Sequence, residues 1–85
     1  MSTQKYLLNP QNKNTMLKIG RRIRTAIAAG DFSYTFIAKK IPCSRPALYS
    51  WMAGKSDIPL SALFKLAEIT RQDVLYFIGK ANLKD

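Results

Sequence analysis

The sequence predicts a compact all-α domain of five helices. Apolar residues recur at steps of three and four residues along most of the chain, and this spacing places them on one face of a helix. Residues that cap or terminate helices separate these periodic segments. With 85 residues, of which 47% are hydrophobic, the chain can form one small domain with a modest core.

The first helix is expected over residues 16–29. Asn14 or Thr15 can cap its beginning, and Gly30 can take the left-handed conformation that ends it. Its buried stripe is predicted to contain Leu17, Ile19, Ile23, Ala26 and Ile27. Its basic residues fall outside this stripe and are Lys18, Arg21, Arg22 and Arg24.

We divide the chain into a flexible arm over residues 1–14, a domain over residues 15–80 and a tail over residues 81–85. The arm is polar and shows no period. Its lysines and Tyr6 either reach a partner or belong to a disordered start of the chain.

Two short helices joined by a tight turn are predicted over residues 34–53. Ser33 can cap the first of them and Ser44 the second, which Gly54 then ends. Pro46 is tolerated because N–H groups in a first turn have no partner within the helix. The apolar face of the pair contains Phe36, Ile37, Ile41, Ala47, Leu48 and Trp51, with a small residue at Ala38.

The second of these helices, expected over residues 45–52, has an outward face unlike a merely solvated surface. That face is basic at its start and carries little charge elsewhere. It is made of Arg45, Pro46, Tyr49, Ser50 and Ala53. We interpret it as a surface that lies against a partner.

The turn between the two helices contains Pro42, whose ring holds φ at about −65°. Proline disfavours helical geometry in the preceding residue, so we expect the first helix to end at Lys40 or Ile41. Cys43 is the lone cysteine, which excludes an internal disulfide. We interpret it as a small buried apolar group.

Two more helices complete the predicted domain. One spans residues 60–69, with a core face of Leu60, Leu63, Phe64, Leu66 and Ala67. The last spans residues 74–79, capped by Asp73 or started earlier by Thr70, and its sequence is apolar on every side. The domain can cover only one face of this helix, so we predict that some of its apolar residues form a dimer contact. The alternative is that they belong to the ordinary core. These residues are Val74, Leu75, Tyr76, Phe77 and Ile78.

The charge of the chain is concentrated in one part of it. The net charge is +9, and residues 1–55 hold ten Lys and Arg against one acid, whereas residues 56–85 hold four of each sign. A polyanion such as DNA is the natural partner for the basic part. The alternative is a solubilising surface.

The sequence offers no candidate residues for catalysis or for metal binding. The chain has no histidine and no glycine-rich phosphate loop, and its five acids are scattered. No apolar run approaches the roughly 20 residues that span a bilayer, and the start lacks the apolar core of a signal peptide. We therefore expect no enzyme, cofactor, metal, small-molecule ligand or membrane association, and a cytoplasmic protein.

The segment from residue 34 to 55 resembles the helix-turn-helix of lambda-repressor and Cro-type DNA-binding domains, the XRE family. Ala38 matches the family's small residue, Leu48 and Trp51 match its anchors, and Trp51-x-x-Gly54-Lys55 matches the end of its recognition helix. The resemblance covers residues 19–78 and includes IGRRIR, FSYTFIAKK and LFKLAEIT.

Two departures from the family stand out. Pro42 occupies the place of the usual turn glycine. Ile27 and Met52 occupy positions where many members place an arginine and a glutamate as a buried ion pair. Packed apolar groups often replace such a pair without loss of stability, so this change agrees with the alignment.

The resemblance implies a five-helix lambda-repressor-like fold and a Cro-like repressor, which binds double-stranded DNA as a homodimer on a near-palindromic operator. The base-reading residues would be Arg45 on guanine, Pro46 on a thymine methyl and Ser50 on a base or phosphate. The DNA-backbone contacts would be Ser33, Tyr34, Ser44, Tyr49, Lys55 and Ser56. The alternative is a protein-binding module of the same fold, such as an antitoxin or an adaptor.

Overall fold

The computed structural model describes the backbone of residues 10–78 and the side chains from residue 14 onward within that range. This part of the chain is compact and all-helical, with no strand, as predicted. The helices are α2 (Pro10–Ala29), α3 (Tyr34–Lys40), α4 (Arg45–Met52), α5 (Leu60–Thr70) and α6 (Val74–Phe77).

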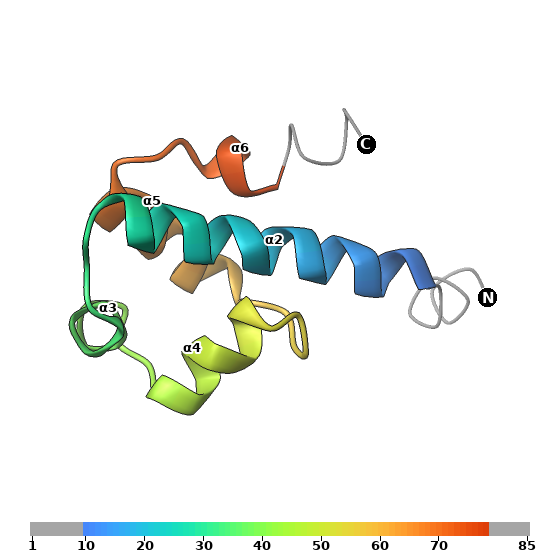
Figure 1. The fold of residues 1–85 in the computed structure, drawn as a ribbon, viewed down its shortest axis with the longest axis horizontal. Helices are drawn as coiled ribbons and strands as arrows, with labels where there is room; N and C mark the ends of the chain where they lie inside the picture. Colours follow the sequence, from blue (N-terminus) through green and yellow to red (C-terminus); the bar gives the residue numbers. More distant parts are fainter. Residues whose placement is uncertain (1–9, 79–85) are drawn as a thin grey trace.

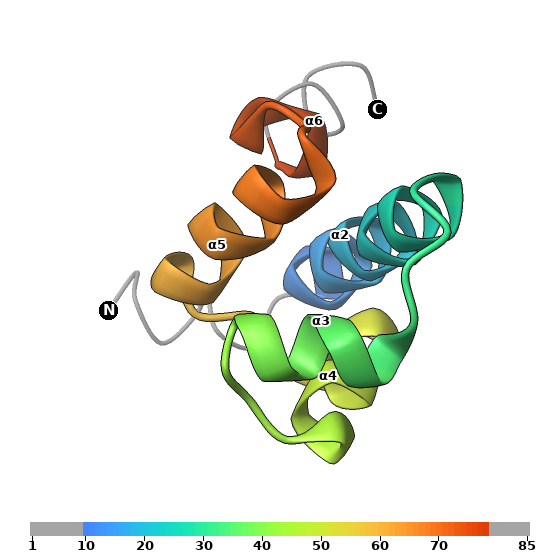
Figure 2. The same ribbon diagram turned by 90° about the vertical axis from the view of Figure 1, so that its left-hand side faces the viewer.

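Helix α2 is the central element of the arrangement. It packs against α4 and α6, while α3 packs against α4 and α5. Figure 1 shows α4 on one side of α2 and α6 on the other. In the view of Figure 2, α3 and α4 again lie together at the end of the molecule opposite α6. The two-helix unit of residues 34–52 therefore forms one end of the molecule.

The predicted start of α2 is wrong. The helix begins at Pro10 rather than at residue 16, so Asn14 and Thr15 lie inside it and cannot cap it. Proline suits the first position of a helix because its missing N–H needs no partner there. At 20 residues, α2 is about 30 Å long. What remains of the predicted arm, residues 1–9, lies outside the described residues, as does the predicted tail.

The left-handed residue that follows α2 is Asp31, with φ 59°, and not Gly30 as predicted. Gly30 still donates a helical hydrogen bond to the carbonyl of Ala26, at 3.2 Å. The reversal therefore comes one residue later, where Asp31 and Phe32 donate to the last free carbonyls of the helix. Aspartate is among the side chains that tolerate this conformation.

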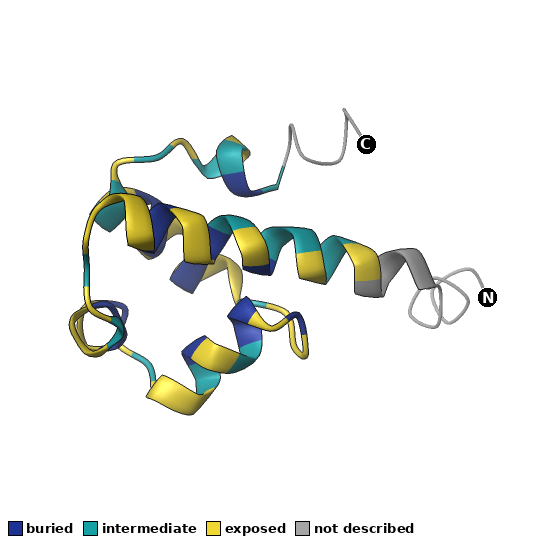
Figure 3. Ribbon diagram, in the orientation of Figure 1, coloured by how far each residue is buried: buried dark blue, intermediate teal, exposed yellow. Residues whose placement is uncertain are grey.

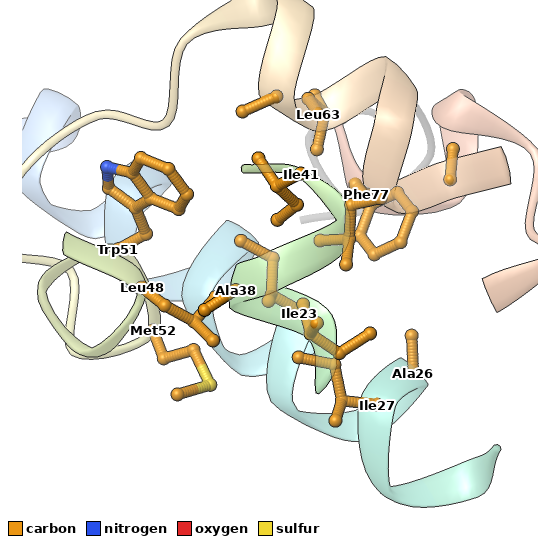
Figure 4. Packing of buried hydrophobic residues seen from close by; sticks show 14 residues of the cluster. Ile23, Ala26, Ile27, Ala38, Ile41, Leu48, Trp51, Met52, Leu63 and Phe77 are labelled. Atoms are coloured by element: carbon orange, nitrogen blue, oxygen red, sulfur yellow. The ribbon is translucent and has the colours of Figure 1, made fainter. Parts of the chain in front are cut away.

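Every helix contributes to the core, which Figure 4 shows at close range. Its largest fully buried side chains are Ile23, Ile27, Ile37, Leu48, Leu66 and Phe77. Ile27 and Met52 are both buried, as expected for an apolar replacement of an ion pair. Of the predicted α2 stripe, Ile23, Ala26 and Ile27 are buried and Ile19 is half-buried, whereas Leu17 is exposed.

The predicted core face of α5 is partly wrong. Leu60 and Phe64 are 62% and 54% exposed. The buried residues are Ala62, Leu63, Leu66 and Ala67. Apolar residues occupy more than half of the circumference of this helix, so the period alone leaves the choice of face open. Packing against α3 and α6 selects the face that includes Ala62.

The short helix α6 is capped by Asp73, whose carboxylate accepts a hydrogen bond from the Leu75 N–H at 3.0 Å, as predicted. It ends at Phe77, and Gly79 lies outside the described residues. Phe77 is fully buried in the core, so a dimer contact cannot include it. Three other residues of the segment are half-buried against the core: Val74, Tyr76 and Ile78. Leu75 alone among the five is exposed, at 52%.

The turn between α3 and α4 differs from the expectation in two respects. Helix α3 ends at Lys40, as predicted, but Ile41 keeps helical angles, with φ −61° and ψ −43°. The Ile41 N–H still donates to the Ile37 carbonyl at 3.0 Å and its side chain is buried, so the last helical turn and the core hold Ile41 in this conformation. The Ile41–Pro42 bond is cis. Cys43 is half-buried rather than buried.

Helix α4 is seated on α2 at a glycine. A Cβ placed on Gly20 would lie 2.7 Å from the carbonyl oxygen of Trp51 and would also overlap that of Met52. Real Cβ atoms do not approach backbone atoms this closely, and a backbone cannot move aside as a side-chain tip can. The close approach of α2 to the end of α4 therefore requires glycine at this position.

We expect Gly20→Ala to lower the free energy of unfolding by about 1–3 kcal/mol, because the two backbones must separate. Urea denaturation followed by circular dichroism measures the change. Thr25→Ala is the matched control, since Thr25 is exposed on the same helix and alanine is the better helix former. A Gly20→Ala variant as stable as the parent would show that the contact is not tight.

Candidate functional site

The candidate site is the outward surface of α3 and α4. Each helix begins at a serine cap, as predicted: the Ser33 hydroxyl accepts from the Phe36 N–H and the Ser44 hydroxyl from the Ala47 N–H, both at 3.1 Å. Both serines are exposed, so each hydroxyl proton can still be donated to an outside acceptor. The caps fix where each helix starts, and hence which side chains project from its first turn.

The inner face of α4 anchors it and the outer face is open. Leu48, Trp51 and Met52 are buried. Arg45, Pro46, Tyr49 and Ala53 are exposed, and Ser50 is half-buried. Figure 3 shows the first turn of α4 as exposed. The division agrees with the predicted helical faces, and Arg45 projects from an end of the helix that the core does not cover.

Gly54 closes the far end of α4, with φ 74°. Its N–H donates to the Trp51 carbonyl at 3.1 Å, and the Lys55 N–H donates to the Ser50 carbonyl at 3.0 Å. This pair of bonds is a Schellman motif. Because both amides are engaged, neither can bind a phosphate. The exposed ammonium of Lys55 is the group that remains for an anion.

Arg45 and Tyr49 form a unit on the outer face of α4. Arg45 Nη2 donates to the Tyr49 hydroxyl at 2.6 Å, and the guanidinium carbon lies 5.6 Å from the centre of the Tyr49 ring. Tyr34 of α3 meets the same ring edge-on, with 5.7 Å between ring centres and an interplanar angle of 78°. Three of the predicted site residues are thereby brought into contact.

Ser50 and Ser56 are also brought together. Their hydroxyl oxygens lie 2.8 Å apart, in a hydrogen bond that ties α4 to the loop that follows it. Lys55 directly precedes Ser56 in the sequence. Within the described part of the chain, neither Lys55 nor Arg45 takes part in an ion pair. The hydrogen bond thereby joins a predicted base-reading residue of α4 to a predicted backbone residue of the loop.

Phe36 is a second aromatic side chain on α3, and the sequence does not predict its exposure. The helical spacing predicts Phe36 on the inner face of α3, yet its side chain is 40% exposed. Its ring stacks on Phe32, with 5.7 Å between centres and 6° between planes, and the Lys40 ammonium lies 5.6 Å from its centre. The four-residue spacing of Phe36 and Lys40 within α3 was the signal available for the second of these contacts, whereas Phe32 precedes the helix.

Burial raises the pKa of the Cys43 thiol, which lowers the fraction of reactive thiolate at neutral pH. Across residues 10–78, no three His, Cys, Asp or Glu side chains gather as a metal site would require. In the same range, no helix has both the length and the hydropathy for crossing a bilayer.

Comparisons with protein-family models, with curated proteins and with solved structures found no match to this chain.

We expect Ser44→Ala to lower the free energy of unfolding by about 1 kcal/mol, because the Ala47 N–H loses its acceptor. Denaturant unfolding gives the loss, and hydrogen exchange at the Ala47 amide locates it. Ser61→Ala is the control: Ser61 is exposed within α5 and should change stability by less than about 0.5 kcal/mol. Equal effects of the two substitutions would contradict the assigned cap.

Proposed function

We propose that this chain is a sequence-specific transcriptional regulator that binds double-stranded DNA through α4. The observation that carries the proposal is the exposed first turn of α4, where Arg45 projects from a helix whose other face is anchored in the core. A helix of this kind fits the major groove and reads base edges with its first residues. The lambda-repressor-like arrangement and Cro-like repression are part of the same proposal.

The geometry of α4 supports this role. A helix with its side chains is about 10–12 Å across, which fits a major groove about 12 Å wide, and the eight residues of α4 are about 12 Å long. Capped ends and a buried inner face hold the helix rigid, which reading a fixed pattern of donors and acceptors requires. In this pose Arg45 meets guanine, Pro46 meets a thymine methyl, and Ser50 touches a base or a phosphate.

Phosphate binding falls to the groups around α4. The exposed serines Ser33 and Ser44 can donate their hydroxyl protons, and Lys55 offers a charge. Tyr34 and Ser56 flank them. Basic residues prevail over residues 1–55 of a chain whose net charge is +9, which favours approach to a polyanion at long range.

A homodimer completes the proposal. A two-fold pair would place its recognition helices about 34 Å apart, one turn of DNA, on a near-palindromic operator. Of the segment predicted for the contact, Leu75 is the exposed residue. Leu60 and Phe64 add exposed apolar surface on α5. These same side chains favour a second candidate function, a protein-binding module such as an antitoxin or an adaptor.

Selection of bound sequences from random duplex DNA, with the mass of the selected complex measured, separates the two functions. A regulator enriches one motif with two-fold symmetry and binds it with two chains. A protein-binding module enriches no motif, and that result would refute the proposed function.

Replacing Arg45 tests the base-reading role. We expect Arg45→Ala to cost about 1–3 kcal/mol at one base pair of the selected site, because two hydrogen bonds to guanine are lost. Binding titrations on the selected duplex and on all single-base variants measure this loss. If Arg45→Ala keeps the parent's ranking of these duplexes, the arginine does not read a base.

Replacing Lys55 tests the phosphate-binding role. Lys55→Gln should weaken binding to every sequence alike and reduce the slope of log K against log salt by about 0.9, the contribution of one phosphate contact. Binding measured between low and moderate salt gives the slope. Lys65→Gln is the matched control, because it removes the same charge from the exposed face of α5. An unchanged slope for Lys55→Gln would argue against the contact.

A further inference from the structure

Arg45 is held by its neighbour before any DNA arrives. Its Nη2 donates to the Tyr49 hydroxyl at 2.6 Å, and its guanidinium carbon lies 5.6 Å from the centre of that ring. Both side chains are exposed, where an arginine otherwise samples many rotamers. Two simultaneous contacts with one ring restrict the arginine to a small part of that range.

Tyr49 is itself braced. Tyr34 meets its ring edge-on at 5.7 Å, and Tyr34 is half-buried and packs on the hydrophobic core. Edge-to-face contact is a favoured geometry for aromatic pairs. The restraint on Arg45 therefore runs through Tyr49 and Tyr34 to the body of the domain, and does not depend on α4 alone.

The restrained arginine keeps its reading capacity. A guanidinium has five N–H donors, and one of them is used on Tyr49. Two adjacent donors remain for the O6 and N7 acceptors of guanine. Tyr49 still has its own hydroxyl proton, which it can donate elsewhere. Holding and reading are thus chemically compatible.

We infer that Tyr49 is a positioning residue that sets specificity: it holds Arg45 so that the protein prefers guanine over adenine at one base pair. This inference rests on the proposed function. Adenine presents an N6 donor where guanine presents the O6 acceptor, so a fixed arginine meets a donor with a donor. An arginine free to move can swing to a phosphate instead and tolerate the adenine.

The expected size follows from the ordering of one side chain. Immobilising an arginine at an interface costs binding free energy equivalent to about two- to tenfold in affinity. Tyr49 reduces that cost when Arg45 binds guanine. It does not strengthen binding to a duplex with adenine at this position, because the held arginine makes no hydrogen bond to adenine N6. The preference for guanine over adenine should therefore depend on Tyr49 by about the same factor.

Tyr49→Phe is the test, because it removes the acceptor and keeps the exposed ring. Affinities are measured for the selected duplex and for the same duplex with the Arg45-dependent guanine changed to adenine. We expect the ratio of the two affinities to fall about two- to tenfold, with an unchanged salt slope. Thr25→Val is the control: it removes an exposed hydroxyl from α2, outside the proposed contacts with DNA, and should leave the ratio as in the parent.

A second measurement needs no DNA. Side-chain ¹⁵N relaxation of Arg45 should show a more ordered Nε–H in the parent than in Tyr49→Phe. Equal disorder in both would overturn the inference while leaving the proposed function intact. An equal loss of affinity for guanine and adenine duplexes would also overturn it, because it would assign the hydroxyl to a phosphate. A parent protein that selects no sequence would refute the proposed function, and the inference with it.

Discussion

The placement of α4 depends on one backbone-to-backbone contact. At Gly20 the absence of a side chain lets α2 lie against the carbonyl oxygens of Trp51 and Met52. Gly54 closes the same end of α4, and a Cβ there would press on Leu17 of α2, at 2.7 Å from its side chain. The end of α4 is thus seated on α2 by two glycines. Its first turn, with Arg45, projects away from this seat into solvent, which gives the candidate site its position.

The candidate site and the core share one short helix. Leu48 and Trp51 are buried on the inner side of α4, while Tyr49 is exposed between them. Burying a large apolar side chain stabilises a fold by about 1.5–3 kcal/mol, a considerable part of the stability of so small a domain. Truncating the inner side chains would therefore lower the free energy of unfolding strongly, whereas changing the exposed side chains of the outer face would affect it little. A helix with this division can keep one fold while the side chains of its outer face change.

Local signals predicted the local features of the fold. The caps Ser33, Ser44 and Asp73 were predicted because a cap depends on neighbours within three residues. The bounds of α4 followed from its cap and from Gly54. The face of α5 could not be predicted, because exposed Leu60 and buried Ala62 are decided by what the helix packs against. The same limit applies to Phe77, which lies in the core rather than at a surface.

In the candidate site, too, contacts within one helix can be predicted from the sequence, whereas contacts between helices cannot. The pairing of Arg45 with Tyr49 spans four residues of one helix and was available from spacing. The contact of Tyr49 with Tyr34 joins two helices, α3 and α4, which pack against each other. The identities of the surface residues can thus be read along the chain. Which of them touch is determined by how the core packs one helix against another, so the contacts among Tyr34, Tyr49 and Arg45 are a property of the fold.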